Sequence, residues 1–331
     1  MSILTDTGLI IYPLLAAFAI ALFAGCFIVP LLARLKMGQH VRDDGPQSHL
    51  KKAGTPTMGG VIFLIAAVVA TVIFARGQFD NVWFLLGVTI AFGIIGLLDD
   101  FIIVVRKHPK GLKAYQKFAL QLLLGLGVAF IAFYDPNIGS SLRLPFTQVE
   151  WELGWWYIPF TVFVVVGVVN SVNLTDGLDG LASSVSSVNT ITFAVIFFGL
   201  YGVSSAAGDA NLTVFAAAMT GGLLGFLRFN THPAKVFMGD TGSLALGAAI
   251  SVMAVISRMQ ILLVLIGMMF LLTTVSVILQ VGSYKLRGKR IFKMAPLHHH
   301  FELKGTPETK IVVFYTIATI LLCLVAVLAV S

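Results

Sequence analysis

Residues 82–100 read VWFLLGVTIAFGIIGLLDD, an unbroken apolar run that ends in two adjacent aspartates. Asp176 and Asp179 follow a second apolar run along the chain, and Asp240 follows a third. A carboxylate at the end of a membrane-spanning helix is costly, and such residues usually mark a substrate or ion pathway. The pattern therefore predicts a membrane protein with a catalytic or ion site at its helix ends.

The composition supports this class of protein. Of the 331 residues, 58% are hydrophobic and 11% are charged, whereas a soluble domain is about half apolar and about one quarter charged. Apolar blocks of roughly the 17–25 residues that cross a bilayer recur along the chain. We expect ten segments, of which the fifth and eighth are short: residues 10–32, 58–74, 82–98, 118–134, 157–169, 185–201, 212–227, 244–256, 261–281 and 311–330. The chain is thus predicted to be an all-α polytopic membrane protein, with one domain over residues 1–331.

The basic residues divide the connections between these segments into two sets. Lys and Arg concentrate in cytoplasmic loops, and 19 of the 22 lie in the 1–2, 3–4, 7–8 and 9–10 connections. The other three are Arg76, Arg143 and Arg258. Both termini are therefore expected outside the cell, and the site is expected to form from the five cytoplasmic loops.

Three of these loops have a functional and a plain structural interpretation. Lys52 precedes GTPTMGG (residues 54–60), which fits either close approach of backbone N–H groups to a phosphate or a simple turn. Asp99 and Asp100 are either ligands or a solvated helix end, and neighbours about 100° apart on a helix seldom bind one ion as equals. Asp240 is either at an anion-binding helix start or a helix N-cap.

The other two loops carry acids and histidines. Residues 170–180 read NSVNLTDGLDG and contain no Lys or Arg, so Asp176 and Asp179 need a partner elsewhere: another loop's lysine, a metal or a polar substrate. The loop lacks the ligand series of an EF-hand. His298, His299 and His300 suggest zinc, but consecutive residues cannot aim at one ion as i, i+4 pairs do. Phosphate binding fits their basic surroundings better.

Together, four stretches resemble the motifs of the polyprenyl-phosphate N-acetylhexosamine-1-phosphate transferases. They are Asp99-Asp100, NLTDGLDG at residues 173–180, FMGDTGS at residues 237–243 and PLHHHFE at residues 296–302. The last is similar to the branch of the family that transfers phospho-MurNAc-pentapeptide. The resemblance extends from Lys52 to Glu302, and the family's ten-segment topology agrees with the count above.

The resemblance implies a reaction and the residues that perform it. Phospho-MurNAc-pentapeptide would move from UDP-MurNAc-pentapeptide to undecaprenyl phosphate, giving lipid I and UMP, with Mg²⁺, at the cytoplasmic face of a bacterial plasma membrane. This is the first membrane step of peptidoglycan synthesis. Asp240 would be the surest Mg²⁺ ligand, Asp99 and Asp100 a catalytic pair and further metal candidates, and His298 catalytic. The implied substrate-binding residues are Lys52, Thr57, Lys117, Asn173, Asp176, Asp179, Asn230, Phe237 (stacked on uracil), His299 and His300.

One position departs from the family's pattern. A lysine usually stands three residues after the second Asp of the pair, and here that position is Ile103, with Arg106 and Lys107 as the nearest substitutes. No role is carried over to it.

Phosphoryl transfer needs mainly positioning and charge neutralisation. A lipid monophosphate with a second pKa of ~6 is mostly dianionic at pH 7, so a strong general base is not essential. We therefore prefer direct attack on the β-phosphate, with Asp99 orienting or deprotonating the lipid phosphate. A covalent route through Asp100 stays open.

Two other functions compete with this interpretation of the sequence. A polyprenyl-phosphate GlcNAc-1-phosphate transferase is disfavoured by the PLHHHFE setting of the histidines. A cation-coupled transporter would place ionisable residues in the middle of its helices, whereas those here lie at helix ends on one face. The expected partners are the two substrates and the bilayer, with no nucleic acid. The oligomeric state is open, and a homodimer is the commonest default.

Overall fold

The structure, a computed structural model, describes residues 7–35, 52, 54–76, 80–105, 111–147, 149–201 and 207–330. Within these residues, nine helices are long and apolar enough to cross a membrane, and α3 is a shorter apolar helix. The long helices and α3 are α2 (Gly8–Arg34), α3 (Gly60–Phe74), α4 (Asp80–Val105), α5 (Ala114–Tyr134), α6 (Tyr157–Thr175), α7 (Leu181–Tyr201), α8 (Ala207–Asn230), α9 (Gly239–Ile256), α11 (Met268–Arg287) and α13 (Glu308–Leu328). The prediction of an all-α polytopic membrane protein is confirmed.

The remaining elements are short. They are β1 (Ser141–Arg143), β2 (Glu150–Glu152), the 3₁₀ helices η2 (Gly154–Trp156) and η3 (Gln260–Leu262), α10 (Leu263–Ile266) and α12 (Leu297–Glu302). The two strands pair antiparallel, with Leu142 opposite Trp151. No strand was expected here, because three residues are too few for an alternating pattern to stand out.

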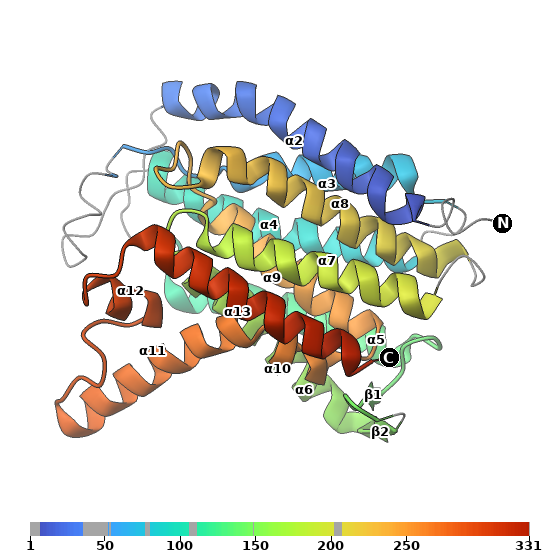
Figure 1. Cartoon of the computed structure of the whole chain (residues 1–331). Coiled ribbons are helices and arrows are strands. Elements are labelled where there is room, and N and C mark those ends of the chain that lie inside the picture. Colours follow the sequence, from blue (N-terminus) through green and yellow to red (C-terminus); the bar gives the residue numbers. More distant parts are fainter. Residues whose placement is uncertain are drawn as a thin grey trace.

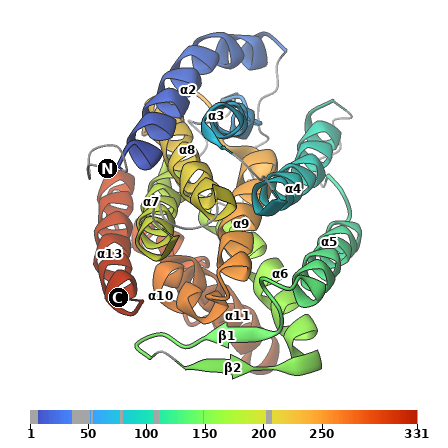
Figure 2. The same ribbon diagram turned by 90° about the vertical axis from the view of Figure 1, so that its right-hand side faces the viewer.

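Helix α9 is the centre of the bundle. All its residues from Thr241 to Ile256 are buried, and it packs against α4 and α6. Figure 2 shows α9 inside a ring that includes α2, α4, α5, α11 and α13. Small residues permit this close packing: a Cβ on Gly247 would lie 2.6 Å from the Cα of Val169, so the backbones of α6 and α9 are nearly in contact.

The observed helices extend past the predicted apolar segments at the ends that carry the motifs. Helix α4 continues from residue 98 to Val105, and α9 begins at Gly239 instead of residue 244. The added turns contain polar residues, so apolar run length underestimates these helices. The ninth predicted segment, residues 261–281, is not one helix: it is interrupted at Gly267, after which α11 continues to Arg287 and diverges from the bundle (Figure 1).

The motif-bearing helix ends gather at one end of the molecule. In Figure 1 this is the end near α12, where α13 begins. Helix α2 begins and α13 ends at the opposite end, near β1 and β2. Large apolar side chains are exposed on outward faces, for example Leu123 on α5 and Leu286 on α11. Such exposure fits contact with lipid.

Candidate functional site

Asp240, in the first turn of α9, is the centre of one polar cluster. Its Oδ1 accepts a hydrogen bond from Asn173 Nδ2 of α6 at 2.7 Å, and its Oδ2 pairs with the Lys117 ammonium of α5. Lys117 Nζ also lies 3.4 Å from Asp99 Oδ2 of α4. Residues from four helices thus form one cluster, in which Lys117 bridges the carboxylates of Asp99 and Asp240.

Asp99 and Asp100 have different partners. The Asp100 carboxylate accepts hydrogen bonds from the backbone N–H groups of Asp240 at 3.2 Å and Thr241 at 2.9 Å, and from Thr241 Oγ1 at 2.7 Å. Asp100 therefore caps the N-terminus of α9 from a neighbouring helix, where a negative charge is favourable. Asp99 Oδ1 accepts from Leu112 N at 2.6 Å. The two aspartates thus have different partners, which fits their angular separation on a helix.

Two glycines allow the close approach around Asp240. Gly239 has a φ of +72°, and a Cβ there would lie 2.6 Å from Asp100 Oδ2 and 2.7 Å from Thr57 Oγ1. A Cβ on Gly96 would overlap the carbonyl oxygen of Asp240. Thr57 and Asp100 therefore lie directly against the turn that presents Asp240, and a side chain larger than hydrogen does not fit there.

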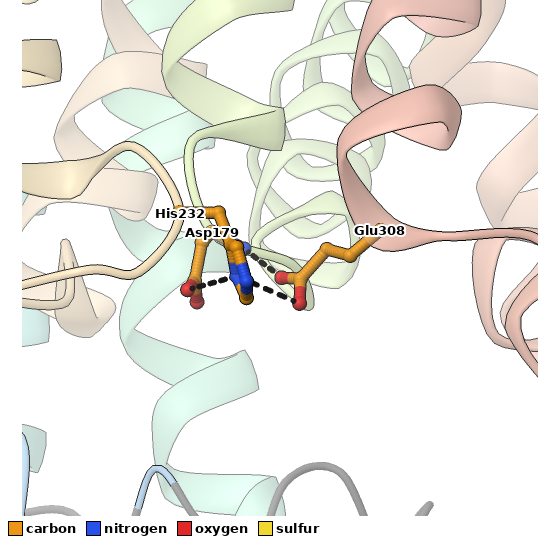
Figure 3. A group of neighbouring side chains, drawn as sticks. All are labelled: Asp179, His232 and Glu308. Carbon is orange, nitrogen blue, oxygen red and sulfur yellow. Dashed lines mark hydrogen bonds and ion pairs between the residues drawn. The ribbon is translucent and has the colours of Figure 1, made fainter.

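A second cluster joins three loops to α13. Lys52 Nζ lies 2.7 Å from both Asp179 Oδ1 and Glu308 Oε1. Asp179 Oδ2 lies 3.1 Å from His232 Nδ1 and accepts from Ala234 N at 3.0 Å. Glu308 Oε1 also accepts from Asp179 N at 2.5 Å, and its Oε2 lies 3.4 Å from His232 Nδ1. Figure 3 shows the His232 ring between the two carboxylates.

Asp176 follows the end of α6, near both clusters. Burial raises the pKa of its carboxyl well above the usual value, and the negative charges of Asp240, Asp100 and Asp179 raise it further. In the part of the chain that the structure describes, no Lys or Arg pairs with Asp176. For Lys52, burial lowers the pKa, but hydrogen bonds and charge from Asp179 and Glu308 outweigh it, so the net pKa is raised.

The three histidines face different partners. His298 is fully buried against Gly177, where a Cβ would overlap His298 Nε2 and lie 3.2 Å from His299 Nε2. His299 Nδ1 lies 3.0 Å from Glu302 Oε2. His300 Nδ1 accepts a backbone N–H from the connection before α12 at 3.0 Å. The rings of His298 and His299 thus lie together against Gly177, with centroids 4.3 Å apart, whereas His300 faces the connection before α12.

Asn230 and Phe237 order the loop between α8 and α9. Asn230 is buried; it accepts from Ser183 Oγ at 2.8 Å and donates to the carbonyl of Val236 at 3.0 Å. Phe237 is half-buried, and its N–H donates to the carbonyl of Pro56 at 2.8 Å. These contacts hold the loop that leads into Asp240.

Glu308 and His232 were not among the residues predicted from sequence. A glutamate in the first turn of a helix has an ordinary explanation, and His232 lies in an exposed loop, so neither stands out. The useful signal was the lack of a cation in the loop of Asp179, which left another loop's lysine, a metal or a polar substrate as its partner. In the structure, Asp179 pairs with Lys52. Ile103 lies near Gly111, whereas Arg106 and Lys107 lie outside the described residues.

Comparison with known proteins identifies the family. The sequence profile of glycosyl transferase family 4 matches residues 82–258, more than half of the chain, and a phospho-N-acetylmuramoyl-pentapeptide-transferase signature matches residues 52–64. A phospho-N-acetylmuramoyl-pentapeptide-transferase of Clostridium novyi is 48% identical over 322 residues, 97% of each chain. Those of Citrifermentans bemidjiense and Heliobacterium modesticaldum are each 46% identical over 96% of this chain, and the match covers 91% and 97% of the relatives.

The helical bundle and these matches define an integral-membrane transferase of the glycosyl transferase 4 class. Within that class, the chain belongs to the phospho-N-acetylmuramoyl-pentapeptide-transferase family. The resemblance seen in the motifs is thereby confirmed. The roles of individual residues stay predictions, and the geometry above is the basis on which they are proposed.

Proposed function

We propose that this chain transfers phospho-MurNAc-pentapeptide from UDP-MurNAc-pentapeptide to undecaprenyl phosphate, forming lipid I and releasing UMP. The names of relatives that align over 97% of the chain support the reaction. The observation that carries the site is the convergence of Asp99, Lys117, Asn173 and Asp240 from four helices at one end of the bundle. There a lipid phosphate and a soluble nucleotide can meet.

The cytoplasmic face of the bacterial plasma membrane is the proposed location of this end. Nineteen of the 22 Lys and Arg residues lie in connections assigned to that side, and the positive-inside rule supports the assignment. Both termini would then lie outside. A single domain and a homodimer stay predictions from the sequence.

Mg²⁺ fits the residues around Asp240. Asp99, Asp100, Asp176 and Asp240 lie near one another, and Lys117 is their one paired lysine among the described residues. Mg²⁺ commonly binds one or two carboxylates together with substrate phosphate oxygens. Asp240 would hold the ion, with Asp99 as its neighbour. When bound, Mg²⁺ neutralises the negative charge of the diphosphate.

The second cluster fits a metal less well. Asp179, His232 and Glu308 present ligand atoms within 4.8 Å of one another. However, the Lys52 ammonium already lies 2.7 Å from both carboxylates. A cation of the chain itself therefore occupies the position between them and offsets half of their charge, and we place no metal there.

Direct attack by the lipid phosphate is the mechanism that the geometry favours. An oxygen of undecaprenyl phosphate would bond to the β-phosphorus, and the bond from that phosphorus to the bridging oxygen would break, releasing UMP. Asp99 would orient the lipid phosphate or accept its proton. Both Asp100 oxygens accept hydrogen bonds from the start of α9, so nucleophilic attack by Asp100 would break the cap that holds Asp240 in place.

The test is UMP release by purified protein in detergent with undecaprenyl phosphate and Mg²⁺. UDP-MurNAc-pentapeptide should support release and UDP-GlcNAc should not; chelation of Mg²⁺ or Asp240→Asn should abolish release. Asp135→Asn, an acid at the opposite end of α5, is the matched control and should keep full activity. Release from UDP-GlcNAc would favour the GlcNAc-1-phosphate branch. Equal release by Asp240→Asn and wild type would overturn the site assignment.

A further inference from the structure

Glu308 makes more contacts with the predicted nucleotide-binding residues than its position at the start of α13 suggests. Its Oε1 lies 2.7 Å from Lys52 Nζ and accepts the Asp179 N–H at 2.5 Å, and its Oε2 lies 2.9 Å from Lys52 Nζ. Its side chain is only 8% exposed, and that of Asp179 is 3% exposed. One carboxylate therefore holds two segments that are far apart in sequence.

These contacts are stronger than an ordinary surface ion pair. Exposed pairs contribute little, whereas hydrogen bonds with an ionised partner are shorter and roughly twice as strong as neutral ones. Loss of one charge from a buried group leaves its partner uncompensated. Without the Glu308 charge, Lys52 would keep only Asp179, and the backbone N–H of Asp179 would lose its ionised acceptor.

The position of Glu308 on α13 makes it a rigid support. Glu308 is the first residue of α13, where a negative charge is stabilised by the helix dipole. Helix α13 packs along α7 and contributes buried residues such as Tyr315 and Thr319. A group held by a packed helix positions its partners better than a group in a loop does. Through Glu308, the packing of α13 fixes the positions of the 176–180 turn and of Lys52 relative to the bundle.

The charge balance also indicates which part of the nucleotide this cluster contacts. Asp179 and Glu308 together outweigh the single charge of Lys52, so the cluster has no free positive charge for a diphosphate. A cluster with this net negative charge repels a diphosphate, whereas its hydrogen-bond donors and acceptors suit the uncharged base and ribose. The diphosphate would then lie toward Lys117 and Asp240.

We propose that Glu308 is a positioning residue for nucleotide binding, which holds Lys52 and the backbone of Asp179 in the geometry that the nucleoside part of the substrate meets. The inference rests on the proposed assignment of Lys52 and Asp179 to substrate binding. Glu308 itself need not touch the substrate.

Glu308→Gln removes the charge and keeps the shape. The Michaelis constant for UDP-MurNAc-pentapeptide should rise about tenfold, the change expected when a charge-assisted contact worth about 1.4 kcal/mol is lost. The dissociation constant of UMP, measured by titration calorimetry, should rise in parallel. The Michaelis constant for undecaprenyl phosphate should stay unchanged, and Glu308→Asp should recover part of the loss. Glu152→Gln, on β2 at the far end, is the matched control.

A double-mutant cycle separates positioning from general stabilisation. If Glu308 acts through Lys52, then Glu308→Gln combined with Lys52→Gln should bind UMP about as weakly as Lys52→Gln alone, because coupled residues are non-additive. Additive effects, or an equal rise in both Michaelis constants with a lowered melting temperature, would overturn the proposal. If Lys52→Gln and Asp179→Asn also leave UMP binding unchanged, the proposed site assignment fails; if they weaken it and Glu308→Gln does not, only the Glu308 inference fails.

Discussion

Asp176 is a buried acid among other acids, and this has a measurable effect on stability. Because its folded-state pKa is raised above that of an unfolded aspartate, about 3.9, folding favours the protonated form. The Asp176 carboxyl destabilises the folded protein least at low pH. The free energy of unfolding falls as pH rises from about 4 through the pKa that Asp176 has in the folded protein. At neutral pH the ligand-free protein is therefore destabilised by this group.

Asp176→Asn should raise the melting temperature of the Mg²⁺-free protein at pH 7.5, by roughly 2–4 °C for each kcal/mol gained. The difference between variant and wild type should shrink as pH falls toward 5. Activity should be lost. Differential scanning fluorimetry in detergent at both pH values measures the shift, and a variant that melts below wild type at pH 7.5 would contradict the pKa direction.

The role of Asp100 distinguishes the two mechanisms that the sequence left open, direct attack by the lipid phosphate and a covalent route through Asp100. If Asp100 serves as the cap of α9, wild type should release no UMP without undecaprenyl phosphate, because no covalent intermediate forms. Asp100→Ala should destabilise the protein by about 1 kcal/mol, as loss of an N-cap does. Rapid-quench measurement of UMP checks the first point. One equivalent of UMP per enzyme in the absence of lipid would instead establish the covalent route.

At the scale of elements, α12 packs closely against Gly177 through its histidines. A side chain on Gly177 would overlap His298 Nε2, whereas a Cβ on Gly167 of α6 would meet nothing within 4 Å. Gly177→Ala should displace the histidine helix and lower kcat at least about tenfold, since small misplacements in a site have large effects on rate. Gly167→Ala is the matched control and should be neutral. Wild-type activity in both variants would show that the position of α12 does not matter.

Helices α5 and α6 are joined one turn from the Asp240 cluster. Asn170 Nδ2 donates to Gln121 Oε1 at 2.7 Å. Gln121 lies one helical turn after Lys117 on α5, and Asn170 lies about one helical turn before Asn173 on α6. Asn170→Ala should therefore lower kcat more than it changes either Michaelis constant. Asn211→Ala removes a comparable bond, to the Arg76 carbonyl at 2.9 Å, far from the site. It should lower the melting temperature but not kcat.

The sequence predicts the membrane-spanning helices well but their ends and long-range contacts poorly, for physical reasons. Apolar runs long enough to span a bilayer identified the helices, but not their ends, because the end turns carry polar site residues such as Asp240 and Asn173. The interruption at Gly267 was missed because both flanks are apolar. Likewise, the motifs pointed to Lys52 and Asp179, but only the packing of α13 brings Glu308 to them. Long-range contacts of this kind leave no local pattern in a single sequence.

At the scale of the whole molecule, the site lies at one end of the bundle, and α2 begins and α13 ends at the opposite end (Figure 1). The distribution of Lys and Arg supports the proposal that the site end faces the cytoplasm. Labelling with a membrane-impermeant maleimide in intact cells tests this, in a background with Cys26 and Cys323 replaced by serine. Glu152→Cys on β2 should react in intact cells, whereas Lys304→Cys, just after α12, should react only after permeabilisation. The reverse pattern would place the Asp240 cluster outside the cell, away from any soluble nucleotide pool, and the proposed reaction could not proceed there.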